Sequence, residues 1–116
     1  MIFTSYHSKT DKLIQAGIVP VCISIYKPRF VLKHKQVHYK PLAPTPEMLK
    51  LGYTWQEFHE KILGKTKVEI VLDDLAKIGK GKDVALLCFE KNDMECHRHV
   101  VRRWLNIAGI KCEEWK

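Results

Sequence analysis

The stretch that decides the fold runs from Ala85 to Leu105 and reads ALLCFEKNDMECHRHVVRRWL. Its first residues form an apolar run typical of a strand that is buried on both faces. From about Asp93 onward, apolar side chains recur at the 3.6-residue period of a helix, with Asn92 or Asp93 as its expected N-cap. A buried strand that leads through a polar turn into an amphipathic helix is the repeating unit of α/β folds.

The rest of the chain alternates between strands and helices in the same way. We expect strands over residues 1–6, 18–25, 37–40, 82–90 and 109–115, the last at an edge of the sheet. We expect helices over residues 8–17, 46–52, 54–64 and 66–79. The pattern predicts an α/β fold of three layers, with a mostly parallel sheet of about four strands. The length of 116 residues suits a single domain over 1–116.

Three sequence signals predict where particular helices begin and end. Ser8 or Thr10 is expected to cap the first helix, and Gly17 is expected to end it in a left-handed conformation. Thr66 and Glu69 have the spacing of a capping box, so they are expected to open the helix over 66–79.

Chemistry-bearing side chains gather in the turn of the deciding stretch. Cys88 and Glu90 end the strand two residues apart, so they face the same side of the sheet. Cys96 and His97 continue the buried stripe of the following helix, whereas Arg98 is expected on its flank, near the mouth of a crevice. In parallel α/β sheets, ligands bind beyond the carboxyl ends of the strands. The turn is therefore the candidate site.

These residue types favour an anionic ligand or thiol chemistry. A helix N-terminus attracts anions and thiolates, which favours a lowered pKa for Cys96. Arg98 offers a planar fork for phosphate or carboxylate. Glu90 can accept a proton or hold a ribose hydroxyl, and His97 can act as acid or base. The structural alternatives are a core thiol at Cys88, a packing role for His97 and an ion pair between Arg98 and Glu90.

Composition narrows the class of protein. The net charge of +7 and the pI near 9.3 favour anionic partners such as nucleic acid or phosphates. The four cysteines are expected to be reduced, because three stand in or beside apolar runs and the N-terminus does not read as a secretion signal. They lack zinc-knuckle spacing, so we expect neither metal nor cofactor. The chain has no run of eighteen apolar residues, so we expect no membrane span. The reduced cysteines and the lack of a secretion signal predict a cytoplasmic location.

The segment LLCFEKNDMECHR resembles a known family, domain-of-unknown-function family 488, whose hallmark is Cys-x-Glu followed by Cys-His-Arg. FTSYHSK and HYKPLAP are also similar to segments of the family, and SIYKPRF stands where longer members carry Asp-x-Arg. The resemblance implies a small Rossmann-like domain. It also implies a pocket lined by Tyr6, Arg29, Cys88, Glu90, Cys96, His97 and Arg98. Ser24 or Ile25 replaces the acidic residue of the longer members; if that acid is catalytic there, this chain binds without turnover.

The leading hypothesis is an enzyme or binder for a phosphate-bearing ligand, such as a nucleotide or nucleic acid. Arg98 and Arg29 would hold the phosphate, while Glu90 and His97 would perform acid–base chemistry. The second hypothesis is a non-catalytic nucleic-acid-binding module, in which basic side chains hold the backbone and aromatic rings stack on bases. Its residues would be His99, Arg102, Arg103, Tyr26, Phe30 and Tyr39. The third is a thiol enzyme that uses Cys96 or Cys88, including a redox pair between them.

Overall fold

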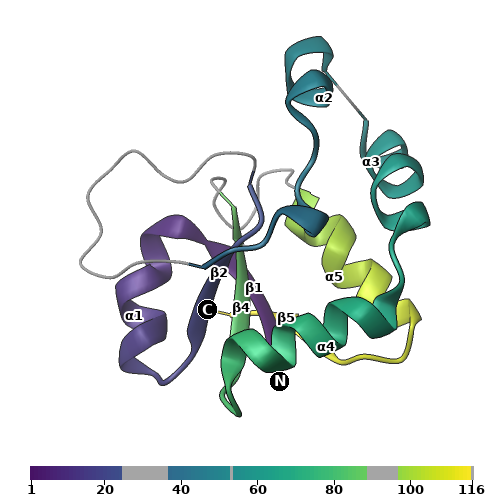
Figure 1. Ribbon diagram of the computed structural model, residues 1–116. Helices are drawn as coiled ribbons and strands as arrows, with labels where there is room; N and C mark the ends of the chain where they lie inside the picture. Colours follow the sequence, from purple (N-terminus) through teal and green to yellow (C-terminus); the bar gives the residue numbers. More distant parts are fainter. Residues whose placement is uncertain (25–36, 53, 89–96, 116) are drawn as a thin grey trace.

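A computed structural model describes residues 1–24, 37–52, 54–88 and 97–115 (Figure 1). Its five strands form one sheet in the order β3-β2-β4-β1-β5, and all paired strands are parallel. The strands are β1 (Ile2–Tyr6), β2 (Val19–Cys22), β3 (Val37–His38), β4 (Val84–Cys88) and β5 (Cys112–Glu114). The predicted α/β fold is confirmed. The short strand within 37–40 and the C-terminal edge strand both form, so the sheet has five strands, not about four.

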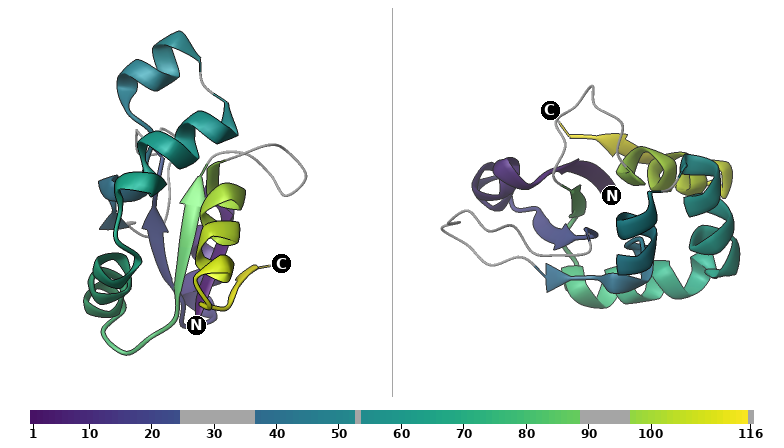
Figure 2. Two further views of the ribbon diagram at one scale, coloured as in Figure 1. Left: turned by 90° about the vertical axis from the view of Figure 1, so that its right-hand side faces the viewer. Right: turned by 90° about the horizontal axis from the view of Figure 1, so that it is seen from above.

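Within the described residues, five α-helices and three short 3-10 turns connect and cover these strands. The α-helices are α1 (Thr10–Gln15), α2 (Pro46–Leu51), α3 (Trp55–Lys61), α4 (Val68–Gly79) and α5 (His97–Ile107). The 3-10 turns are η1 (His7–Lys9), η2 (Lys40–Leu42) and η3 (Leu63–Lys65). Helices α2 and α3 project beyond the sheet (Figure 2). No helix within the described ranges is long and apolar enough to cross a membrane.

Strand β4 lies at the centre of the sheet and packs on both faces. Val84 and Leu86 belong to the large core that contains residues of α4 and α5, whereas Ala85 and Leu87 pack with Leu13 of α1. All five residues of β4 are buried, and each large apolar side chain contributes about 1.5–3 kcal/mol on burial. The sheet is therefore the middle layer of three, as the continuous apolar run of this strand predicted.

The strand order places a topological switch point between β1 and β4. After β1 the chain passes through α1 to β2, which lies beyond β4 in the sheet. After β4 it passes through α5 to β5, which lies beyond β1 at the opposite edge. Helix α1 packs on one face of the sheet and α5 on the opposite face. In open α/β sheets such a divergence opens a crevice at the carboxyl ends of the two strands.

The predicted end of α1 is confirmed, whereas the predicted N-caps of α1 and α4 are wrong. Gly17 takes a left-handed φ of 79° after α1, as expected. Helix α1 instead starts after the η1 turn without a side-chain cap, because the Thr10 hydroxyl donates to the carbonyl of His7. The predicted capping box at Thr66 is wrong: Lys67 is the N-cap of α4, and the Thr66 hydroxyl donates to the carbonyl of Ile62.

A capping box does form one helix earlier, where the sequence analysis did not place one. The Thr54 hydroxyl accepts a hydrogen bond from the backbone N–H of Glu57 at 3.1 Å, and the Glu57 carboxylate accepts from the backbone N–H of Thr54. This reciprocal pair satisfies two backbone donors at the start of α3.

Candidate functional site

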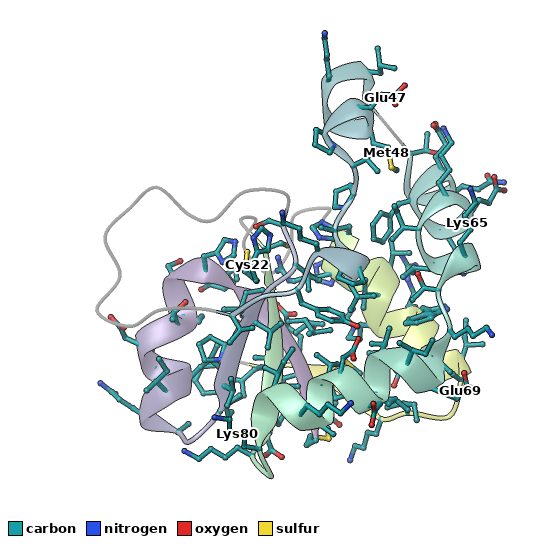
Figure 3. All side chains as sticks on the ribbon, viewed as in Figure 1. Cys22, Glu47, Met48, Lys65, Glu69 and Lys80 are labelled. Carbon is teal, nitrogen blue, oxygen red and sulfur yellow. The ribbon has the colours of Figure 1, made fainter. Side chains whose placement is uncertain are left out.

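Buried polar side chains concentrate around the carboxyl ends of the strands. Among the residues that the structure describes, the polar or charged ones with at most 5% exposure are Thr4, Ser5, His7, Thr10, Ser24, His97 and Arg98. His7 follows β1 and Ser24 follows β2, while His97 and Arg98 begin the described part of α5. Figure 3 shows Cys22, the last residue of β2, at the opposite end of the sheet from Lys80. Buried polar groups are costly unless they are paired, so such a concentration marks a candidate site.

Tyr6 and Cys88 stand side by side at the switch point. They are register partners at the ends of β1 and β4, and Arg98 Nη1 donates to Cys88 Sγ at 3.2 Å. The Arg98 guanidinium lies 5.9 Å from the centre of the Tyr6 ring, and Lys9 Nζ lies 5.7 Å from it. The half-buried Tyr6 ring is thus within cation–π distance of two positive charges.

Arg98 itself is held by a carboxylate. Its Nε and Nη2 donate to Glu114 Oε1 and Oε2 at 3.3 and 3.1 Å, which is a bidentate ion pair. Thr4 Oγ1 also donates to Glu114 Oε1, at 2.6 Å. The Arg98 side chain is fully buried, so the expected place at the mouth of the crevice is wrong. The long side chain reaches inward because Glu114, at the end of β5, compensates its charge.

The cysteines differ in redox state. Cys22 and Cys112 are buried free thiols, whereas Cys88 is disulfide-bonded. The expectation that every cysteine is reduced is therefore wrong for Cys88. The carboxyl end of β4 places its sulfur among the polar groups of the site, beside Arg98, and not inside the apolar core. Burial raises the pKa of the Cys112 thiol to about 12.

A second polar group lies on the other side of the switch point. His7 Nε2 and Ser24 Oγ are 3.0 Å apart, and both side chains are buried. The Sγ of Cys22 lies 3.1 Å from Ser24 Oγ and 4.0 Å from His7 Nε2. The Ser24 hydroxyl therefore contacts both a thiol and an imidazole. Together the three side chains form a hydrogen-bonded chain of ionisable or nucleophilic groups.

Two further histidines hold the backbone that follows β2. His97 Nε2 donates to the carbonyl of Ile23 at 2.6 Å, and His38 Nε2 donates to the carbonyl of Ser24 at 2.7 Å. The His97 ring also packs edge-on against Phe58 of α3, with ring centres 5.2 Å apart. Because a carbonyl can only accept, both imidazoles carry a proton on Nε2. His97, a predicted acid–base residue, thus also positions the strand end.

Burial keeps two imidazoles neutral near pH 7. Desolvation lowers the pKa of His7 to about 4, with smaller contributions from the neighbouring charges of His97, Arg98 and His38. Desolvation also lowers the pKa of His97 to about 4, against the opposing hydrogen bond to Ile23. Both imidazoles are therefore in the neutral form near pH 7, which is the form that can accept a proton.

Tyr39 is not part of this group. The residue is 8% exposed and belongs to the core shared with α4, where its hydroxyl donates to Asp74 Oδ2 at 2.6 Å. Burial and this hydrogen bond raise the pKa of Tyr39. Its ring cannot stack on a base without leaving the core.

Several predicted residues lie outside the described residues. They are Arg29, Glu90 and Cys96, together with Tyr26 and Phe30 of the alternative nucleic-acid-binding surface. Of the remaining basic residues of that surface, Arg103 is exposed, whereas Arg102 approaches Glu114 at 3.8 Å. In the part of the chain that the structure describes, no group of three or more His, Cys, Asp or Glu side chains is placed to hold a metal ion.

Sequence reasoning missed four residues of the site, namely His7, Ser24, His38 and Glu114. His7 directly follows β1, His38 ends β3 and Ser24 lies two residues after the end of β2, and this position near a strand end is the signal that could have found them. Glu114 gave no such signal, because its role depends on β5 lying beside β1.

The comparisons with known proteins agree with the resemblance found in the sequence. A family model described as the active DUF488-N3 subclade matches residues 5–109. This range includes every described residue of the site except Thr4 and Glu114. No curated protein matches the chain, and no solved structure matches it.

Proposed function

Since this chain belongs to the DUF488-N3 family, we propose that it is an enzyme acting on a phosphate-bearing ligand, a nucleotide or a nucleic acid. The ligand would lie at the carboxyl edge of the sheet, between the ends of β1 and β4. The description of the matched subclade as active supports catalysis over binding alone. The buried and neutral imidazoles support proton transfer in the same place.

The environment of Tyr6 is the observation that best supports a phosphate-bearing ligand. An aromatic ring at the switch point has two cations within 6 Å of its centre, at 5.7 and 5.9 Å. The exposed part of the ring can stack on a base, and the Lys9 ammonium can approach the attached phosphate. The net charge of +7 would draw such a ligand toward the protein.

A thermal-shift panel tests this proposal. The panel contains nucleotides, sugar phosphates, sulfate, and short DNA and RNA, each with the wild type, Tyr6→Leu and Lys9→Ala. A ligand at a hundred times its Kd adds about 2.7 kcal/mol of stability, which raises the Tm by several degrees. We expect one phosphate compound to stabilise the wild type strongly and both variants weakly.

Lys12→Ala is the matched control, because Lys12 is an exposed lysine of the adjacent α1. It should keep the full shift. A shift that is equal in all four proteins would move binding away from Tyr6, and a panel without any shift would refute the phosphate-bearing ligand. Arg98→Ala is a poor probe of phosphate binding here, because it removes the bidentate partner of the nearly buried Glu114 carboxylate and so destabilises the fold.

One observation favours a second function, thiol–disulfide chemistry. Cys88 is disulfide-bonded, and Arg98 Nη1 lies 3.2 Å from its sulfur. After a two-electron reduction by a dithiol, the guanidinium would stabilise the Cys88 thiolate. We also propose a cytoplasmic location, supported by the free thiols of Cys22 and Cys112. Cytoplasmic disulfides are mostly catalytic or redox-sensing, so this location would make the disulfide functional.

Alkylation after reduction separates the two functions. The wild type is reduced with dithiothreitol, freed of reductant and treated with iodoacetamide at pH 6.5, and the labelled cysteines are mapped by mass spectrometry. A thiol enzyme should label at Cys88 far faster than at Cys22 or Cys112. Slow labelling at Cys88 would leave the phosphate-directed proposal as the better account.

A further inference from the structure

We propose that Ser24 is a nucleophile that His7 activates, and that it forms a covalent serine ester with a phosphorus centre of the ligand. This inference rests on the proposed function for its ligand class. It adds an attacking atom, a general base and a covalent intermediate, with residues that the sequence analysis did not assign to catalysis.

The geometry of the pair is that of a nucleophile and its base. Ser24 Oγ lies 3.0 Å from His7 Nε2, within the range over which a base takes a proton from a hydroxyl. His7 follows β1 and Ser24 follows β2, the two strands that flank β4, so both lie at the carboxyl end of the parallel sheet, where ligands of α/β proteins bind. Burial keeps the imidazole neutral at pH 7, so that it can accept the proton.

Ser24 is also held rigidly. The backbone N–H of Ile23 donates to the carbonyl of Leu87 at 3.0 Å. His97 donates to the carbonyl of Ile23, and His38 donates to the carbonyl of Ser24 itself. Three elements, β4, α5 and β3, thereby fix two consecutive residues. A fixed backbone keeps the hydroxyl oriented toward its base before the ligand arrives, which is what preorganisation requires.

Cys22 is the neighbouring nucleophile, but geometry favours the hydroxyl. Cys22 Sγ lies 4.0 Å from His7 Nε2, a full 1 Å farther than Ser24 Oγ, and the cysteine is fully buried. Its Sγ contacts Ser24 Oγ at 3.1 Å. Either atom can donate in this contact, and in the arrangement where the thiol donates, the serine proton points at the imidazole. Cys22 is therefore a positioning residue in this scheme.

The step balances within these groups and the ligand. The Ser24 Oγ–H bond breaks and its proton passes to His7 Nε2, while Oγ forms a bond to phosphorus. The bond between phosphorus and the leaving oxygen breaks, and the imidazolium gives its proton to that oxygen. Water then hydrolyses the serine ester with His7 again as base, which releases the phosphate product and restores the hydroxyl.

A fluorophosphonate tests the nucleophile without knowledge of the natural ligand. Attack by Ser24 Oγ on its phosphorus forms a stable phosphonate ester and expels fluoride. Intact mass spectrometry of the wild type should show one adduct, and peptide mapping should place it on Ser24. Because a general base contributes about 10²–10⁴-fold, His7→Gln should slow the labelling by at least about a hundredfold.

Ser24→Ala should abolish the adduct, and Ser8→Ala, at an exposed serine, should not change it. Mapping on the wild type keeps the test valid even if a variant fails to fold. No adduct on Ser24, an adduct on Cys22, or equal rates in the wild type and in a folded His7→Gln variant would overturn the inference. An adduct on Ser24 without any thermal shift by phosphate compounds would retain the nucleophile and refute the ligand class. A thermal shift by a phosphate compound without an adduct on Ser24 would retain the ligand class and refute the nucleophile.

Discussion

Arg98 and Glu114 form a bidentate ion pair, with N–O distances of 3.3 and 3.1 Å, between the start of the described part of α5 and the end of β5. The arginine side chain is fully buried and the carboxylate is only 10% exposed. The pair therefore joins the edge strand to the helix and delivers one remaining guanidinium nitrogen to Cys88. An arginine that the sequence indicated as a ligand-binding residue also serves as a structural link.

Removal of one partner of this pair should be severely destabilising. Arg98→Met leaves the nearly buried Glu114 carboxylate with the longer ion-pair contact to Arg102, at 3.8 Å, and loss of one partner of a buried pair typically costs about 3–5 kcal/mol. We expect the urea midpoint of unfolding to fall accordingly. The double variant Arg98→Met/Glu114→Gln should recover part of the loss, because it removes both charges together.

The exposed pair of Lys111 and Glu113, 3.5 Å apart, is the matched control on the same edge strand. Glu113→Gln should cost no more than about 1 kcal/mol, as exposed ion pairs do. Equal losses for Arg98→Met and Glu113→Gln would contradict a buried structural role for Arg98.

Stability should depend on pH through His7 and His97. Both have a pKa of about 4 in the folded protein, lowered from 6.5. Between these values the unfolded chain binds more protons than the folded chain, so the free energy of unfolding falls as the pH drops from 6.5 to 4. Above pH 6.5 both states hold these imidazoles neutral, and the two residues contribute no further slope.

Urea unfolding at a series of pH values from 4 to 7.5 measures this slope. His97→Gln keeps a donor for the Ile23 carbonyl and should flatten the curve, whereas His59→Gln, at an exposed histidine of α3, should not. A curve that His7→Gln and His97→Gln both leave unchanged would show that the two histidines are protonated alike in both states.

Cys112 should resist alkylation in the folded protein. A pKa raised from 9.0 to about 12 lowers the thiolate fraction at pH 8 about a thousandfold, since each pKa unit is a factor of ten. Mass spectrometry after N-ethylmaleimide treatment should find Cys112 modified only in urea. Rapid modification of Cys112 under native conditions would contradict its burial.

The capping box of α3 should contribute to stability, and the one expected from sequence at α4 should not. Thr54→Ala removes an acceptor for the N–H of Glu57 and should cost about 1 kcal/mol. Glu69→Ala should change stability by less than about 0.5 kcal/mol, because Glu69 is exposed and α4 has no side-chain cap. Thermal unfolding of the two variants measures the difference. The reverse ranking would restore the sequence-based assignment.

The amino-acid pattern predicted most of the fold because its signals are local. The continuous apolar run of β4 marked a strand buried on both faces, and the period of Val100, Val101 and Leu105 marked the buried stripe of α5. The predicted N-cap of α4 is wrong because it too rested on a local signal alone. Thr66 has the right spacing, but its hydroxyl donates to the carbonyl of Ile62, the residue before η3.

By itself, the sequence determined that strands and helices alternate, and it indicated Cys88, His97 and Arg98 as candidate site residues. Only the tertiary structure decided which side chains meet there. His7 and Ser24 are 17 residues apart, and Arg98 and Glu114 are 16 apart. These pairs depend on the order and register of parallel strands, which long-range packing sets. A periodicity of two or 3.6 residues says which face a residue occupies, and strand order then decides what lies opposite.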